Sequence, residues 1–393
     1  MVLWTVCSTR NNNKLLRADL SGGKMRLAFV LNNWFPYGGL QRDLVKVVNA
    51  CKDRADITIY CMTWEGEALP NVETVLVPVR SLSRTTQRQQ FADYILSNVS
   101  GKFDKVLGFN RMPGLDYYFA ADTCFAEKSY SERGWWYRQT PRAKQYLAFE
   151  AAVFGPDSQT KILLLSPSQR EEYTRHYHTP AHRLQDLPPG IGRDHMATPE
   201  ASQIRADFRK EFGIADAELL VLQVGSSFAT KGVSRALRAI AALPPALKKH
   251  TQFFLVGHDN PSPWLREAES LGVANFQVFA GRNDIPRWMQ GADLLLHPSI
   301  HESAGMVLLE AIVAGLPVLT TANCGYAFYV ERAEAGIVCP EPFEQHNLNA
   351  ELVKMLESDR STWKRNGIRY GQEHNLYSMP EAVARILLDG DQH

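Results

Sequence analysis

The chain has 393 residues, more than one hydrophobic core usually organises, so its length predicts two domains of ordinary size. Hydrophobic residues make up 45% and charged residues 22%, a composition that excludes a disordered or collagen-like protein. The 43 basic and 42 acidic side chains nearly cancel, so the overall charge gives no reason to expect a protein that coats nucleic acid.

The near-neutral total conceals an uneven distribution of charge. Residues 25–190 carry a net charge of +3 and residues 191–393 a net charge of −5, while residues 1–24 add +3. No stretch approaches the roughly 20 continuous apolar residues of a membrane-spanning helix. Polar residues between positions 10 and 17 stand where a signal peptide needs its apolar core. We therefore expect a protein of the reducing cytosol, and its scattered cysteines form no CxxC pair or metal-type cluster. The cysteines are Cys7, Cys51, Cys61, Cys124, Cys324 and Cys339.

The first half of the chain is typical of a parallel sheet with crossover helices. Residues 1–24 lack a convincing period, and we interpret them as a dispensable, disordered extension that precedes a candidate start at Met25. A strand is expected over residues 25–31, then a Gly-rich turn and a helix with apolar residues at helical spacing. Further apolar runs cover residues 57–62, 75–79 and 105–109. The pattern predicts a Rossmann-like domain over residues 25–187.

A Pro- and Gly-rich segment, residues 187–191, marks the predicted domain boundary. The pattern then restarts with a strand over residues 219–224, a loop over 225–232 and a helix over 233–243, and we expect a second Rossmann-like domain over residues 192–368. Residues 369–393, which include an amphipathic helix, are expected to pack back on the first domain. Two such domains predict a ligand cleft beyond the carboxyl ends of their strands. The remaining expected strands of the second domain cover residues 253–256, 276–280, 294–297 and 317–320.

The most informative segment covers residues 297–315. A loop carries Glu302, a helix is expected over about residues 304–314, and Glu310 lies about two turns into it. Carboxylates accept paired hydrogen bonds from vicinal hydroxyls, which indicates a sugar or ribose ligand. For either glutamate alone, a helix cap or a solvated surface position is the alternative. Free backbone N–H groups at the helix start offer a seat for an anionic or hydroxylated group. They belong to Ala304, Gly305 and Met306.

Two glycine-containing loops are further candidates for ligand binding. The loop from Gly225 to Gly232 follows a predicted buried strand, and Lys231 within it would place a positive charge where a leaving group becomes negative. An ordinary turn with a solvated lysine is the alternative. Gly38 and Gly39 precede a predicted helix and form a candidate backbone anion site, although a bare turn would have the same residues.

Several longer strings resemble one family. Together with the Glu302-x7-Glu310 spacing, they are similar to the lipopolysaccharide core glucosyltransferase I family, within the retaining GT-B glycosyltransferases of family 4. The likeness runs from about Met25 to the C-terminus. The strings are Phe35–Asp43, Thr63–Gly66, Gly108–Asp116, Tyr118–Asp122, Leu187–Ile191, Gly281–Asp284 and Leu316–Thr321.

The resemblance implies an α/β fold of the GT-B type, with two Rossmann-like domains that face each other across a cleft. It implies transfer of glucose from UDP-glucose to a heptose of the lipopolysaccharide inner core, with retention of configuration and without metal or cofactor. The implied partners are a UDP-sugar, the lipopolysaccharide acceptor and an anionic membrane surface, with no nucleic acid. The implied location is the cytoplasmic face of the inner membrane, where the protein would be peripheral.

The resemblance also implies residue roles. Glu302 would hold the donor sugar, Glu310 the ribose, and Lys231 the departing diphosphate. Apart from the resemblance, Asp122 is a candidate for a contact near the reacting centre, with a helix cap as an equally weighted alternative. The family usually has an arginine in the lysine-containing loop, but none occurs here between positions 225 and 231, and Arg282 is the candidate replacement. The expected donor-binding residues are Gly38, Gly39, Gly225, Lys231, Arg282, Glu302, Ala304, Gly305, Met306 and Glu310.

Residues 131–146 mix aromatic and cationic side chains, a composition typical of a segment at an anionic membrane surface. A tryptophan pair in the core with solvated cations is an equally weighted alternative from this segment alone. The basic first half and a phosphorylated lipid acceptor favour the membrane interpretation. The expected membrane and acceptor residues are Trp135, Trp136, Arg138, Arg142 and Lys144.

Other functions share parts of this pattern. Another UDP-sugar glycosyltransferase, or a sugar-nucleotide epimerase or hydrolase of the same fold, would use the same cleft. A non-catalytic UDP-sugar sensor is favoured only by the missing loop arginine. A dinucleotide oxidoreductase is disfavoured because neither first strand is followed by a G-x-G-x-x-G loop. The sequence leaves open the donor sugar, the acceptor position and the oligomeric state.

Overall fold

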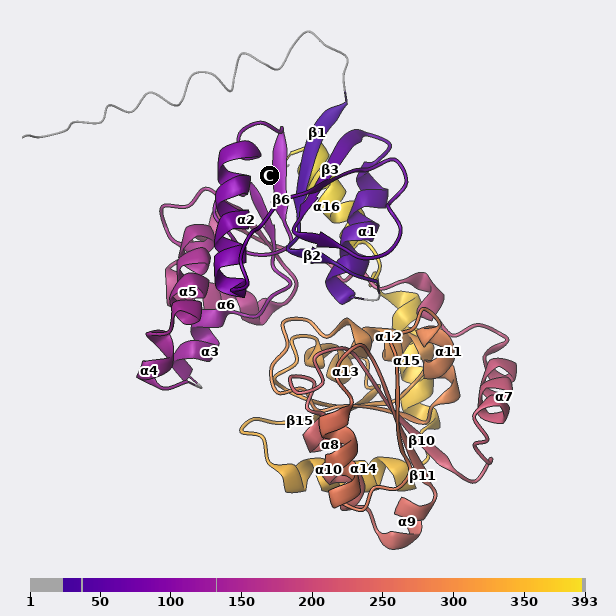
Figure 1. Ribbon diagram of the computed structural model, residues 1–393. Helices are drawn as coiled ribbons and strands as arrows, with labels where there is room; N and C mark the ends of the chain where they lie inside the picture. The colour runs from indigo at the N-terminus through magenta and orange to yellow at the C-terminus, as the bar shows by residue number, and fades with distance from the viewer. Residues whose placement is uncertain (1–23, 37, 132, 391–393) are drawn as a thin grey trace, which may run out of the picture.

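The computed structural model describes residues 24–36, 38–131 and 133–390, so the expected extension lies outside it except for Lys24. Two parallel sheets, each covered by helices, lie one above the other in Figure 1. The central strands are short, continuous apolar runs buried on both faces, as the residues from Leu27 to Leu31 illustrate, whereas the edge strand Glu73–Leu76 is partly exposed. This architecture confirms the predicted α/β class.

The first sheet has seven strands in the order β5-β3-β1-β6-β7-β8-β9, all parallel. A two-stranded pair, β2 (Asn33–Trp34) and β4 (Thr63–Trp64), lies beyond the carboxyl ends of β1 and β3. The strands are β1 (Met25–Val30), β3 (Ala55–Cys61), β5 (Glu73–Leu76), β6 (Lys105–Gly108), β7 (Tyr117–Phe119), β8 (Lys161–Leu164) and β9 (Leu184–Asp186). The helices of this half are α1 (Gly39–Cys51), α2 (Arg84–Asn98), α3 (Phe125–Ser131), α4 (Trp135–Arg138), α5 (Pro141–Phe154) and α6 (Pro167–Tyr177), with a short 3-10 turn at Ala181–Arg183.

The second sheet has six parallel strands in the order β12-β11-β10-β13-β14-β15. Its strands are β10 (Leu219–Val224), β11 (Thr251–Val256), β12 (Phe276–Phe279), β13 (Leu294–His297), β14 (Val318–Thr321) and β15 (Gly336–Cys339). The helices after the 3-10 turn Arg193–His195 are α7 (Ala201–Glu211), α8 (Val233–Ala241), α9 (Pro245–Lys249), α10 (Ser262–Ser270), α11 (Ile285–Gly291), α12 (Met306–Ala314), α13 (Ala327–Arg332), α14 (Gln345–Glu357), α15 (Ser361–Glu373) and α16 (Met379–Leu388).

The chain crosses between the two halves twice, and the two crossings run side by side. The Ile191 N–H donates to the Leu376 carbonyl at 3.1 Å, and the Met379 N–H donates to the Pro189 carbonyl at 3.1 Å. Helix α15 packs on α12 of the second half, whereas α16 packs on α1 of the first half (Figure 1). The last helix of the chain therefore returns to the first sheet.

Local chemistry explains three of the differences between the observed and the expected bounds. The strand expected over residues 75–79 ends at Leu76, and the strand expected from residue 317 begins at Val318, because Pro78 and Pro317 have no N–H to donate to a neighbouring strand. The helix expected from about Ala304 begins at Met306, since Gly305 has a left-handed backbone with φ of +86°.

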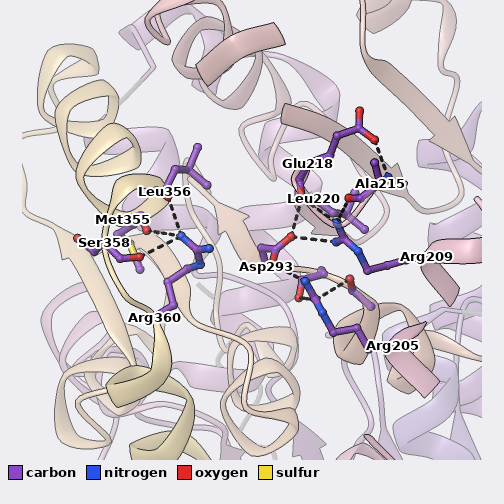
Figure 2. Close-up of polar contacts among 12 residues, drawn as sticks. Arg205, Arg209, Ala215, Glu218, Leu220, Asp293, Met355, Leu356, Ser358 and Arg360 are labelled. Atoms are coloured by element: carbon purple, nitrogen blue, oxygen red, sulfur yellow. Dashed lines mark hydrogen bonds and ion pairs between the residues drawn. The ribbon is translucent and has the colours of Figure 1, made fainter. Parts of the chain in front are cut away.

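A largely buried acidic residue, Asp293, anchors β13, the strand that leads into the candidate site (Figure 2). Asp293 accepts hydrogen bonds from Arg205 at 2.7 Å, from Arg209 at 3.2 Å and from the Leu220 N–H at 2.8 Å. These contacts hold α7 and the starts of β10 and β13 together. In the same view Arg360 donates to the carbonyls at the end of α14.

Candidate active site

A cleft of about 810 Å³ lies beyond the carboxyl ends of the strands and is lined by residues of both halves. This is where ligands bind in open α/β sheets. All the predicted donor-binding and catalytic residues line it, whereas the predicted membrane residues do not. The cleft-lining predicted residues are Gly38, Gly39, Asp122, Gly225, Lys231, Arg282, Glu302, Ala304, Gly305, Met306 and Glu310.

Three side chains form a charged cluster at the centre of the second half. The Lys231 ammonium donates to one carboxylate oxygen of Glu302, and His297 Nε2 lies 2.7 Å from the other. Burial disfavours the charged carboxylate, but Lys231 and His297 outweigh it and hold the pKa of Glu302 well below its usual range. Glu302 is therefore an acceptor with both oxygens oriented. It is not the isolated helix cap considered as an alternative.

His297 is a site residue that sequence reasoning missed. Its side chain is fully buried at the end of β13, and its Nδ1 atom has no hydrogen-bond partner among the described residues. The available signal was its place at a strand end, five residues before Glu302. His297 fixes the orientation of the Glu302 carboxylate from the buried side.

The loop that carries Glu302 is fixed by its own backbone. The Glu302 N–H donates to the Asn323 carbonyl at 3.0 Å, and the Gly325 N–H donates to the Glu302 carbonyl at 2.9 Å. A Cβ atom on Gly305 would overlap the Cys324 sulfur, so only glycine fits between this loop and Cys324. The carboxylate is thus held on a rigid turn.

The loop of Lys231 packs directly on the loop of Glu302. Gly232 has φ of +72°, and a Cβ atom there would overlap the Pro298 carbonyl. The Ile300 N–H donates to the Thr230 carbonyl at 2.9 Å, which ties the two loops together. Because β10 and β13 are neighbours in the sheet, this contact brings Lys231 onto Glu302.

Glu310 is buried and is not a solvated surface residue, which excludes that alternative. Its carboxylate oxygen Oε1 lies 3.7 Å from Arg42 of α1 and 3.7 Å from His195. Next to it, burial raises the pKa of Asp43 to about 6, although Lys46 and Arg42 oppose the shift. The Glu310 contact with Arg42 joins the two halves across the cleft.

Two further predicted donor contacts, Gly38 and Arg282, differ in their structural setting. Gly38 caps α1, and a Cβ atom there would overlap the Gln41 side chain, so the backbone at this helix start is closely packed. Arg282 donates twice to Asp284, at 2.6 and 3.1 Å. Arg282 lines the cleft with its charge already paired, so it is a weaker substitute for the missing loop arginine than a free cation.

Asp122 lies in the loop after β7. A buried ion pair holds this loop through hydrogen bonds to the backbone that follows Asp122. Glu150 is fully buried, lies 2.5 Å from Arg111, and accepts from the N–H groups of Phe125 and Ala126 at 2.6 and 2.9 Å. Arg111 also donates to the Thr123 carbonyl at 2.7 Å. Sequence reasoning missed this pair, whose two members come from different elements. It fixes the start of α3 and the loop that carries Asp122.

The residues predicted to face a membrane lie on an exposed projection formed by α3, α4 and the start of α5 (Figure 1). Trp135 and Trp136 are 55% and 78% exposed, so the alternative that they belong to the core is wrong. Arg138 lies over the Tyr130 ring at 4.6 Å and donates to the Ser129 carbonyl. In the described part of the chain, the helices are too short or too polar to span a bilayer.

One group in the described residues has the composition of a metal site. His297, Glu302 and Cys324 each place a potential ligand atom within 4.8 Å of the others. Burial, with the negative charge of Glu302, raises the pKa of the Cys324 thiol well above its ordinary value. The ammonium group of Lys231 also occupies one side of Glu302. A neutral Cys324 thiol and the Lys231 ammonium group on Glu302 make this group a poor metal site.

Comparison with known proteins places this geometry in context. Residues 204–370 match the family of glycosyl transferases group 1. The lipopolysaccharide glucosyltransferase WaaG of Escherichia coli (strain K12) is 43% identical over 371 residues, which cover 93% of this chain and 99% of that protein. A crystal structure of WaaG, a glycosyltransferase involved in lipopolysaccharide biosynthesis, superposes with a TM-score of 0.89 over 92% of this chain and 99% of that one, at 43% identity. Anabaena HepE in complex with UDP and glucose shares the fold, with a TM-score of 0.71 and 17% identity over 92% of this chain and 99% of that one.

Proposed function

The chain belongs to the WaaG family of GT-B glycosyltransferases of lipopolysaccharide core biosynthesis, and from this premise we propose that it transfers glucose from UDP-glucose to a heptose of the inner core. The transfer would retain the anomeric configuration and need no metal. The observation that carries this proposal is the charged cluster of Lys231, Glu302 and His297 in the cleft between the two sheets.

The donor would lie against the wall of the cleft that the second half of the chain forms. Glu310, buried beside Arg42, would accept from the ribose hydroxyls, and the backbone at Gly38, Gly39 and Gly225 would approach the diphosphate. Glu302 would accept hydrogen bonds from the glucose hydroxyls, because His297 fixes its carboxylate at the cleft wall. The N–H groups at the start of α12, at Ala304, Gly305 and Met306, line the same cleft.

The reaction breaks the bond between the anomeric carbon and the diphosphate oxygen and forms a bond to the acceptor hydroxyl on the same face. The departing phosphate oxygen takes the acceptor proton, and UDP leaves. Lys231 would stabilise the negative charge on the diphosphate, which requires its ammonium group to turn from Glu302 toward the phosphate. Asp122, on the opposite wall, would orient the acceptor hydroxyl.

The same proposal places the protein on the cytoplasmic face of the inner membrane. The exposed Trp135 and Trp136, next to the cations Arg138, Arg142 and Lys144, have the composition of an interfacial anchor. Such a projection would bring the acceptor side of the cleft close to a lipid-anchored acceptor. Peripheral binding needs both the apolar and the cationic side chains.

Purified protein, a panel of UDP-sugars and truncated core lipopolysaccharide test the function directly. We expect one glucose per acceptor, a retained anomeric configuration by NMR, and unchanged turnover in EDTA. Release of sugar or epimerised donor without acceptor would identify a hydrolase or epimerase instead. UDP-glucose binding without any product would identify a sensor.

A further inference from the structure

Two arginines of the first half have no carboxylate partner among the described residues. Arg88 of α2 lines the cleft, as do Asp122 and Asn110, whereas Arg142 at the start of α5 is outside the cleft lining. Among residues 24–36, 38–131 and 133–390, neither arginine has a carboxylate oxygen within 4.0 Å. Most other cleft cations are paired, since Arg42, Lys231 and Arg282 each contact an acidic group.

The ring of Tyr146 contacts both guanidinium groups. Arg88 lies 4.9 Å from the ring centroid and donates to the Tyr146 hydroxyl, and Arg142 lies 5.7 Å from the same centroid. Phe125 stacks on the Tyr146 ring, with 4.9 Å between the two ring centroids. Stacking on an aromatic ring restricts a guanidinium group and leaves its N–H edge available to a ligand.

The helices that carry this cluster are fixed relative to each other. The Gln145 side chain of α5 donates to the Thr85 carbonyl of α2 at 2.7 Å, and the two helices pack side by side (Figure 1). The third arginine near the ring, Arg111 at 5.8 Å, is already neutralised by Glu150. The local excess of positive charge is therefore that of Arg88 and Arg142.

We propose that Arg88, positioned by Tyr146 and assisted by Arg142, binds an anionic group of the phosphate or carboxylate type on the acceptor saccharide. This inference rests on the proposed function and adds the substrate class of its acceptor side. A planar guanidinium donates two parallel hydrogen bonds to a phosphate or carboxylate, which gives orientation as well as affinity. Because Arg88 and Asp122 line the same cleft, an anion held by Arg88 would orient the acceptor saccharide with a hydroxyl toward the reacting centre.

Calorimetric titration with lipid-free inner-core oligosaccharide tests this directly, because it requires no turnover. We expect Arg88→Gln to weaken binding of the native oligosaccharide by about ten-fold or more. Binding of an oligosaccharide without anionic groups, in which the phosphates are removed enzymatically and the carboxylates are reduced to alcohols, should be unchanged, and removal of the phosphates alone distinguishes the two anions. Tyr146→Phe should weaken binding less, since the ring remains. Arg84→Gln, an exposed arginine one turn earlier on α2, is the matched control and should behave as wild type.

Two further measurements separate this proposal from its alternatives. Binding of UDP should be the same in wild type and Arg88→Gln, which shows that the donor half is intact. Binding to phosphatidylglycerol vesicles should also be unchanged. Equal weakening for both oligosaccharides, or weakened vesicle binding with unchanged oligosaccharide binding, would overturn the proposal. Failure of the proposed transferase function would be recognised independently, as absent glucose transfer by the wild-type protein.

Discussion

Removal of the Lys231 charge should lower both the unfolding free energy and the turnover, and a second substitution at Glu302 should restore only the unfolding free energy. In Lys231→Met the side chain keeps its length, but Glu302 loses the cation on one oxygen while His297 still contacts the other at 2.7 Å. Loss of one member of a buried ion pair typically costs 3–5 kcal/mol. Since the two side chains are 19% and 14% exposed and His297 remains, we expect the lower end, about 3 kcal/mol of unfolding free energy.

The double variant Lys231→Met/Glu302→Gln provides the decisive comparison. It removes both charges, so no buried carboxylate is left without its cation, and it should be more stable than Lys231→Met alone. Turnover should nevertheless be lost in both variants, because the charge that stabilises the diphosphate is absent from each.

Urea unfolding at several pH values, followed by tryptophan fluorescence, measures the effect. The pKa of Glu302 is held below its usual range in the folded protein, so the stabilisation by Lys231 is fully present above about pH 5 and is lost as pH falls further. The stability gap between wild type and Lys231→Met should narrow accordingly. A double variant that is no more stable than Lys231→Met, or normal turnover in Lys231→Met, would refute this reasoning.

Three further predictions concern other parts of the molecule. Burial raises the pKa of Asp43 to about 6, so the wild-type protein loses stability as pH rises from about 4 to 6. In urea unfolding, Asp43→Asn should therefore gain up to about 3 kcal/mol of unfolding free energy over wild type across this window. A stability difference between Asp43→Asn and wild type that does not change with pH would contradict this, and the exposed Asp53→Asn is the control. Asp293→Ala leaves Arg209 buried without its carboxylate and should cost about 3 kcal/mol of unfolding free energy, and a loss below about 1 kcal/mol would show that the network is dispensable. Changing the three cations of the projection together to serine should weaken sedimentation with anionic vesicles in a salt-dependent way, and binding equal to that of a control with three exposed cations replaced elsewhere would exclude the membrane role. The projection cations are Arg138, Arg142 and Lys144, and the control cations are Arg84, Lys102 and Lys249.

The sequence by itself determined the fold class and the position of the central motifs. Strands β10 and β13 match their expected bounds, because a parallel strand buried on both faces is a continuous apolar run that can be recognised locally. The spacing of Glu302 and Glu310 likewise follows from the chain. These features depend on neighbours in sequence, so they were predictable.

Only the tertiary structure decided which groups pair with one another. Lys231 and Glu302 are 71 residues apart and meet because β10 and β13 are adjacent in the sheet. The Arg42 contact with Glu310 depends on how the two halves meet, and no local pattern indicates it. The cluster of Arg88 and Tyr146 likewise requires α2 and α5 to pack together. Ion pairs and ring contacts of this kind depend on distances in space, which the order of residues along the chain does not specify.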